Sequence, residues 1–145
     1  MKMLIAVDLA HNSEAVIEAA AELAMSLSAS VCIPHAVEPD PDFVGYEVGP
    51  QTRRDAVAET FHEEHRQVQN LAGHFRQAEL DAVGLLVQGP TVETILREAE
   101  KFKADLIVVG SHGKGQLKQL VLGSVSEGVL RKSACPVVVI PIRTR

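Results

Sequence analysis

Short apolar runs alternate with helical segments along the whole chain, and this alternation restricts the fold more than any other feature of the sequence. The apolar runs occupy residues 3–7, 31–37, 84–87, 106–109 and 137–140. Apolar residues recur with helical periodicity over residues 14–27, 52–78, 91–102 and 124–131. Strands that are apolar throughout are typical of a parallel sheet with helices on both faces. We therefore expect a single α/β domain over residues 1–145, built on an open parallel sheet of five strands.

Prolines mark the end of this pattern and its longest interruption. Pro136 and Pro141 flank the run at 137–140. Because proline cannot donate to a strand ladder, it suits a sheet edge, and we expect this strand at an edge. Residues 38–50 combine prolines with aspartates and predict a loop whose length suggests function or mobility.

Charge and composition exclude several classes of function. The 145 residues carry a formal net charge of −5. No basic stripe with interleaved aromatic residues is present, which argues against nucleic acid as a partner. No apolar segment approaches the roughly 20 residues that span a bilayer, and no signal peptide is recognisable. We expect a cytoplasmic protein without membrane insertion, in which Cys32 and Cys135 are unpaired thiols.

A glycine-punctuated segment follows the fourth apolar run. Gly110 and Gly113 open it, and Gly123 and Ser124 close it where a helical run begins. Glycines let backbone N–H groups approach a ligand closely, and a helix start adds further donors, so the segment predicts a phosphate-binding loop. It matches neither the P-loop nor the dinucleotide fingerprint. A structural turn, in which Ser124 and Glu127 form a capping box, is the alternative.

Other segments end at the same edge of the sheet if the strands are parallel. Asp8 follows the first apolar run, Ala36 lies near the end of the second, and Gly110 ends the fourth. Ligands of open parallel sheets bind beyond the carboxyl ends of the strands, where the strand order reverses. If the first and fourth strands are neighbours, these residues face one crevice. That convergence favours a nucleotide site over a structural turn.

These residues resemble the universal stress protein family, and specifically its ATP-binding branch. The family pattern Gly-x2-Gly-x9-Gly-Ser/Thr is matched by Gly110, Gly113, Gly123 and Ser124. The resemblance covers the whole chain through residues 6–8, 34–37, 89–90, 105–113, 122–126 and 135–141. It implies one universal stress protein domain over residues 1–145 with a Rossmann-like fold of the adenine nucleotide alpha hydrolase type. The strand order implied by the resemblance is 3-2-1-4-5.

The resemblance also implies a site and a ligand. The positions that match the family's nucleotide-binding residues are Asp8, Ala36, Val109, Gly110, His112, Gly113, Gly123, Ser124, Val125 and Ser126. The expected ligand is ATP, with or without Mg²⁺ or Mn²⁺, and neither a catalytic residue nor a metal ligand is assigned. Family members commonly form homodimers through the last strand, so residues 137–140 are expected to pair with a second copy.

The sequence favours binding over catalysis. We expect a regulatory module of the stress response in which ATP orders residues 113–123 and 39–50, and a partner protein reads the changed surface. Slow ATP hydrolysis or adenylyl transfer in the same crevice is the alternative. No activating base, arginine finger or carboxylate pair is evident near the loop. A third interpretation is an interaction module that keeps the fold without binding a nucleotide.

Several side chains admit two interpretations. Leu9 and Ala10 stand where the family often has Gly and Ser, so contacts at the first loop are expected to differ. His62 and His65 could share a metal ion, but a solvated helix face is favoured because no third ligand is evident. For His35, a packed and hydrogen-bonded side chain is favoured over a catalytic one.

Overall fold

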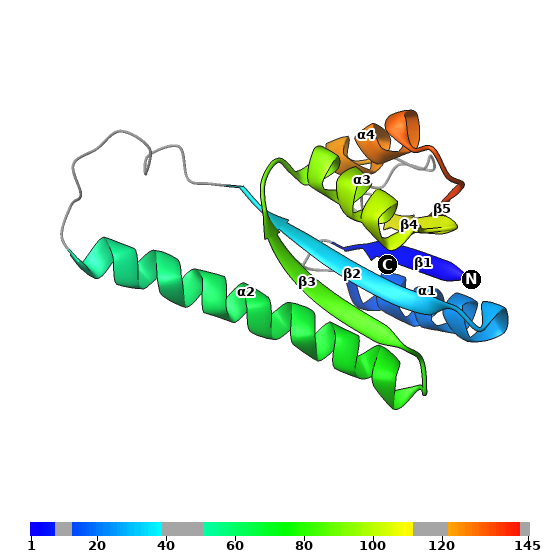
Figure 1. Ribbon diagram of the computed structural model, residues 1–145, viewed down its shortest axis with the longest axis horizontal. Helices are drawn as coiled ribbons and strands as arrows, with labels where there is room; N and C mark the ends of the chain where they lie inside the picture. Colours follow the sequence, from blue (N-terminus) through cyan, green and yellow to red (C-terminus); the bar gives the residue numbers. More distant parts are fainter. Residues whose placement is uncertain (8–12, 39–50, 112–121, 143–145) are drawn as a thin grey trace.

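The computed structural model describes residues 1–7, 13–38, 51–111 and 122–142. One parallel sheet has the strand order β3-β2-β1-β4-β5 (Figure 1). The strands are β1 (Lys2–Ala6), β2 (Ser30–Val37), β3 (Ala82–Gln88), β4 (Leu106–Gly110) and β5 (Val137–Ile140). The helices are α1 (Ser13–Leu27), α2 (Gln51–Gln77), α3 (Thr91–Phe102) and α4 (Ser124–Lys132). The predicted fold class and strand order are confirmed.

The helices form a layer on each face of the sheet. α1 and α2 cover one face, and α3 and α4 lie over the other (Figure 1). β1 lies between β2 and β4, so the first and fourth strands are neighbours, as the convergence argument required. The chain therefore reverses its direction of winding between β1 and β4, and the carboxyl ends of both strands lie at this switch point.

The face under α1 and α2 carries the larger core cluster. Met3, Ile5, Val31, Ile33 and Val108 supply its sheet side and are at most 1 % exposed. Helical side chains close it from outside, among them Ile17, Ala20, Ala24, Ala72 and Phe75. Small alanines on both helices allow them to approach the sheet closely, and Phe75 fills the remaining space.

The opposite face carries a smaller cluster. Its buried members are Leu4, Ile95, Ala99, Ile107, Val109 and Val129. The alternation of side chains along β1 and β4 explains the division, because successive residues of a strand point to opposite faces. Leu4 therefore joins this cluster while its neighbours Met3 and Ile5 join the other.

β3 begins at Ala82, two residues before the predicted start at Gly84. The reason is its pairing with β2, which starts at Val31↔Ala82 and is preceded by a hydrogen bond from Val31 N to Asp81 O of 2.7 Å. β5 lies at the opposite edge of the sheet, which confirms the position predicted from its flanking prolines.

α1, α2 and α3 end in the same way. Each is followed by a left-handed residue that is not glycine: Ser28 (φ 47°), Glu79 (φ 61°) and Lys103 (φ 57°). The next residue then donates its N–H back to a carbonyl five residues earlier, which is the Schellman arrangement. These bonds join Ala29 to Ala24 (2.9 Å), Leu80 to Phe75 (3.2 Å) and Ala104 to Ala99 (2.9 Å).

The proline-containing loop predicted within 38–50 lies, beyond Glu38, outside the described residues. None of the helices in the described part of the chain combines the length and apolar character needed to cross a lipid bilayer.

Candidate functional site

The candidate site is built around the carboxyl end of β4. Its last residue, Gly110, is packed so closely that a Cβ atom there would lie 2.8 Å from Val16 Cγ2 and 3.2 Å from Ile142 Cδ1. Val16 belongs to α1, and Ile142 follows β5. Glycine is therefore required here for packing, because any side chain would push α1 or the chain after β5 away from the end of β4.

The residue after Gly110 fastens this end of the sheet. Ser111 is 5 % exposed, and its N–H donates to Ile140 O at 2.9 Å. Its hydroxyl accepts a hydrogen bond from Ile142 N at 2.7 Å. These bonds hold the chain after β5 against the end of β4 and so fix the wall beside Gly110.

α4 presents its first turn to the same region. Gly123 is its N-cap, with an extended backbone (φ −70°, ψ 165°) and no side-chain cap. The first intrahelical bond runs from Glu127 N to Gly123 O at 2.9 Å. The N–H groups of Ser124, Val125 and Ser126 precede that bond, so they have no intrahelical partner and point out of the helix start. Donors of this kind, at the positive end of the helix dipole, suit an anionic ligand.

The alternative interpretation of Ser124 and Glu127 as a capping box is wrong. Gly123 is the N-cap, and the Glu127 carboxylate pairs with Arg131 one turn along the helix (Oε1 to Nη2, 2.7 Å). Glutamate followed by a cation at i+4 is a favourable helical pair. The pairing neutralises the acidic side chain that the sequence places closest to the donors.

A side-chain hydrogen bond connects α4 to β4. The Ser126 hydroxyl donates to Gly110 O at 2.8 Å. It joins residues that are sixteen positions apart in the sequence and sets the first turn of α4 against the end of the strand. The hydroxyl is thereby engaged with the protein, and the main-chain N–H of Ser126 remains the group directed away from the helix.

Ala36 lies at the same end of the sheet, near the end of β2. Val31 N bonds to Asp81 O, and Val37 O accepts from Gly89 N, so the odd-numbered residues of β2 face β3. Main-chain groups alternate in direction along a strand, so those of Ala36 face β1. The ladder between β1 and β2 stops at Leu4↔Cys32. The main chain of Ala36 thus faces the switch point beyond the last ladder pair.

The structure brings some of the predicted site residues together. Gly110, Gly123, Ser124, Val125 and Ser126 meet where β4 ends and α4 begins. Val109 is 1 % exposed and belongs to the smaller core cluster, so its main chain is the part that could reach a ligand. Three predicted residues, Asp8, His112 and Gly113, lie outside the described residues.

Other candidate side chains occupy different environments. His62 and His65 are exposed on α2, and no group of three metal-ligating side chains occurs within the described ranges. His35 Nε2 lies 3.8 Å from the Glu64 carboxylate, on the α2 side of the sheet. Burial, together with the nearby Glu98 carboxylate, raises the pKa of the Cys32 thiol from 9.0 to about 11. Cys32 and Cys135 are both free thiols.

Sequence reasoning missed three contributors to this region. Val16 and Ile142 pack against Gly110, and Ser111 ties the end of β4 to the chain after β5. The sequence did contain a signal for Ser111, because this residue lies inside the glycine-punctuated segment. Val16 and Ile142 have none, because they are ordinary apolar residues whose role follows from the tertiary arrangement.

The comparison with known families decides the class of protein. Residues 1–141 match the sequence profile of the Universal stress protein family. The chain belongs to this family. A universal stress protein of Thermus aquaticus is 35 % identical over 133 residues, which cover 90 % of each sequence. The predicted family membership is confirmed.

Solved structures of universal stress proteins share the fold. One from Methanocaldococcus jannaschii superposes with a TM-score of 0.79 at 24 % identity, covering 99 % of this chain and 97 % of that one. A universal stress protein of Archaeoglobus fulgidus, solved in complex with dAMP, superposes with a TM-score of 0.63 at 21 % identity and covers 97 % of each chain.

Proposed function

We propose that this universal stress protein binds ATP at the carboxyl end of its sheet, and acts in the cytoplasm as a regulatory module through binding rather than turnover. The observation that carries the proposal is the first turn of α4, whose N–H groups at Ser124, Val125 and Ser126 precede the first intrahelical bond. These donors are held beside Gly110 by the Ser126 hydroxyl. Such a group of fixed donors matches the oxygen atoms of a phosphate chain.

Ala36 supports an adenine ligand in particular. Its main-chain donor and acceptor face β1 beyond the last ladder pair, where they could meet the polar edge of a base. The related A. fulgidus protein was solved with dAMP, which is an adenine nucleotide. Asp8, His112 and Gly113 complete the proposed site on the basis of the family resemblance. The titration below tests whether a divalent ion accompanies the phosphates.

The test uses proline at the helix start. Ser124→Pro removes one main-chain donor, and Ser124→Ala removes only the hydroxyl. Proline is tolerated in the first helical turn, and the extended backbone of Gly123 is the conformation required before a proline. By calorimetric titration with ATP and MgCl₂, we expect Ser124→Pro to bind roughly tenfold more weakly than Ser124→Ala. Equal affinities of the two variants would remove α4 from the site.

Two further measurements test the need for Mg²⁺ and distinguish ATP binding from ATP hydrolysis. Titration of the unaltered protein with ATP in EDTA reports whether Mg²⁺ is required. Phosphate release measured over hours tests slow hydrolysis, and turnover well above the rate of buffer alone would assign an enzyme. Failure of the unaltered protein to bind ATP would favour the nucleotide-free interaction module.

The proposal includes a homodimer that pairs β5 of two copies. β5 is an edge strand of four residues, all of them half-buried, so its outer backbone groups can accept a second strand. Light scattering of the protein with and without ATP measures whether the two properties are linked. The partner protein that would respond to the ligand is a separate question, answered by co-purification.

A further inference from the structure

The free edge of β3 exposes a defined set of backbone groups. β3 ends the sheet on the side opposite β5, and α2 runs beside it (Figure 1). Asp81 O accepts from Val31 N and Gly89 N donates to Val37 O, so these residues face β2. Because main-chain groups alternate along a strand, the carbonyls of Ala82 and Gly84 face outward. Outward carbonyls of an edge strand are the acceptors that an added strand would use.

Two side chains of α2 occupy these acceptors. Gln69 Nε2 donates to Gly84 O at 3.0 Å, and Arg76 Nε donates to Ala82 O at 2.9 Å. The two donors lie two helical turns apart and therefore on one stripe of the helix. Residues two apart in a strand present their carbonyls on the same side, so both donors reach acceptors on the outer side of β3.

Gly84 makes this contact possible. A Cβ atom at this position would lie 2.8 Å from Val68 Cγ1 and 2.9 Å from Val68 O. The second of these is a backbone atom of α2 and cannot rotate away. The absence of a side chain at Gly84 therefore lets α2 lie directly against β3, close enough for the short amide of Gln69 to reach the strand.

The two edges of the sheet differ in this respect. Within residues 13–38, 51–111 and 122–142, no helix side chain donates a hydrogen bond to a carbonyl of β5. β3 is longer, with seven residues against four, and would otherwise be the better strand for pairing. The longer edge is the one that carries the hydrogen-bonded cover.

We propose that Gln69 and Arg76 are edge guards, which block strand addition at β3 and so direct association with a second copy of this chain to other surfaces. A strand that added to β3 would have to displace both side chains from their carbonyls. The arginine also brings a positive charge to the edge, which opposes the approach of an identical edge. This role does not depend on nucleotide binding or on the proposed β5 dimer.

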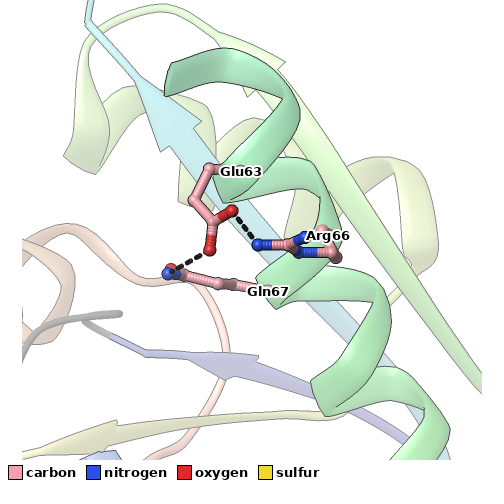
Figure 2. Close-up of polar contacts among 3 residues, drawn as sticks. All are labelled: Glu63, Arg66 and Gln67. Atoms are coloured by element: carbon pink, nitrogen blue, oxygen red, sulfur yellow. Dashed lines mark hydrogen bonds and ion pairs between the residues drawn. The ribbon is translucent and has the colours of Figure 1, made fainter. Parts of the chain in front are cut away.

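The experiment compares two double variants of α2. Gln69→Ala/Arg76→Ala removes both guards. Arg66→Ala/Gln67→Ala is the matched control, because it deletes the same two residue types from the same helix. The control side chains bond to Glu63 on the helix surface rather than to β3 (Figure 2). Both variants lose one positive charge, so a difference in self-association between them is due to the uncovered edge of β3.

Sedimentation velocity over a range of protein concentrations measures association. We expect the guard variant to form species larger than those of the unaltered protein, with self-association strengthened roughly tenfold or more by the freed acceptors. The control should sediment like the unaltered protein. Hydrogen–deuterium exchange then locates the contact, because the outward amides of Gly84 and Leu86 become protected when a strand adds to β3.

Each outcome of these measurements either supports or contradicts the guard role. Larger species with slower exchange in residues 82–88 support the guard role. Species of unchanged size, or larger species without added protection of β3, would overturn it. Gln69→Leu/Arg76→Met keeps most of the side-chain volume while removing the donors, and it replaces the alanine variant in both measurements if circular dichroism shows that the alanine variant is unfolded.

Discussion

The two helical layers bury the two faces of one sheet with different chemistry. The layer of α1 and α2 closes its cluster with alanines and Phe75. The layer of α3 and α4 covers a smaller cluster, and α3 buries two polar side chains, Thr94 and Glu98. The first layer encloses the larger cluster, so we expect it to contribute more of the stability, while the second carries the helix start that a ligand could use.

The largest effect expected from this difference is at Phe75. Phe75→Ala should lower the free energy of unfolding by about 3–5 kcal/mol, because the ring is fully buried and its removal leaves a cavity. Urea denaturation measures the change. Phe61→Ala is the control on the same helix, since Phe61 is 39 % exposed and its truncation should cost less than about 1 kcal/mol. Similar losses at both positions would contradict the assignment of the main core.

The second prediction concerns Cys32, which lies near Glu98 of the α3 layer. The folded pKa of about 11 is above the ordinary value of 9.0. The unfolded thiol therefore ionises first, and stability that is present below pH 9 is lost between pH 9 and 11, by up to about 3 kcal/mol. Relative to Cys32→Ala, the advantage of the unaltered protein should shrink across this window in urea titrations. A constant difference would show that the folded thiol ionises normally.

The third prediction probes the smaller cluster. Val129→Ala removes two methyl groups from a fully buried position on α4 and should cost about 2 kcal/mol. Leu130→Ala, at a neighbouring residue that is 45 % exposed, should be nearly neutral by the same denaturation measurement. A loss at Val129 as large as that at Phe75 would mean that the layers contribute equally, and the comparison would fail.

The smallest expected effect is at Ser126. Ser126→Ala removes the hydrogen bond to Gly110 O and should cost about 1 kcal/mol of stability. Affinity for ATP should fall as well, because the first turn of α4 is no longer fixed. Gly128→Ala perturbs the same helix in a different way, because the added Cβ atom would lie 2.9 Å from Val92 Cγ2 on α3. If Ser126→Ala binds ATP as the unaltered protein does, the hydrogen bond has no part in shaping the site.

Most of the fold could be predicted from the sequence, because the signals are local. Apolar runs located the strands, prolines placed β5 at an edge, and the family resemblance supplied the strand order, which the pairing of β1 with β4 confirms. The start of β3 was missed because Ala82 and Val83 form too short an extension to stand out, and their strand character comes from pairing with β2.

The candidate site could be predicted only in part. Glycine spacing located Gly110 and Gly123, but it could not show that Gly110 is demanded by Val16 and Ile142 from distant parts of the chain. The capping box failed for a related reason. Glu127 has two possible partners within one turn, and pairing with Arg131 competes with capping. The sequence does not show which partner Glu127 takes, because the choice depends on where the fold makes the helix begin.

The Schellman ends of α1, α2 and α3 are positions where substitution should increase the thermal stability of the protein. Each places a residue with a side chain in a conformation that glycine adopts without strain, at a cost of about 1 kcal/mol. Ser28, Glu79 and Lys103 lie in separate turns, so relief at one should add to relief at the others. Glycine at all three positions would raise the melting temperature while leaving the ligand-facing end of the sheet untouched.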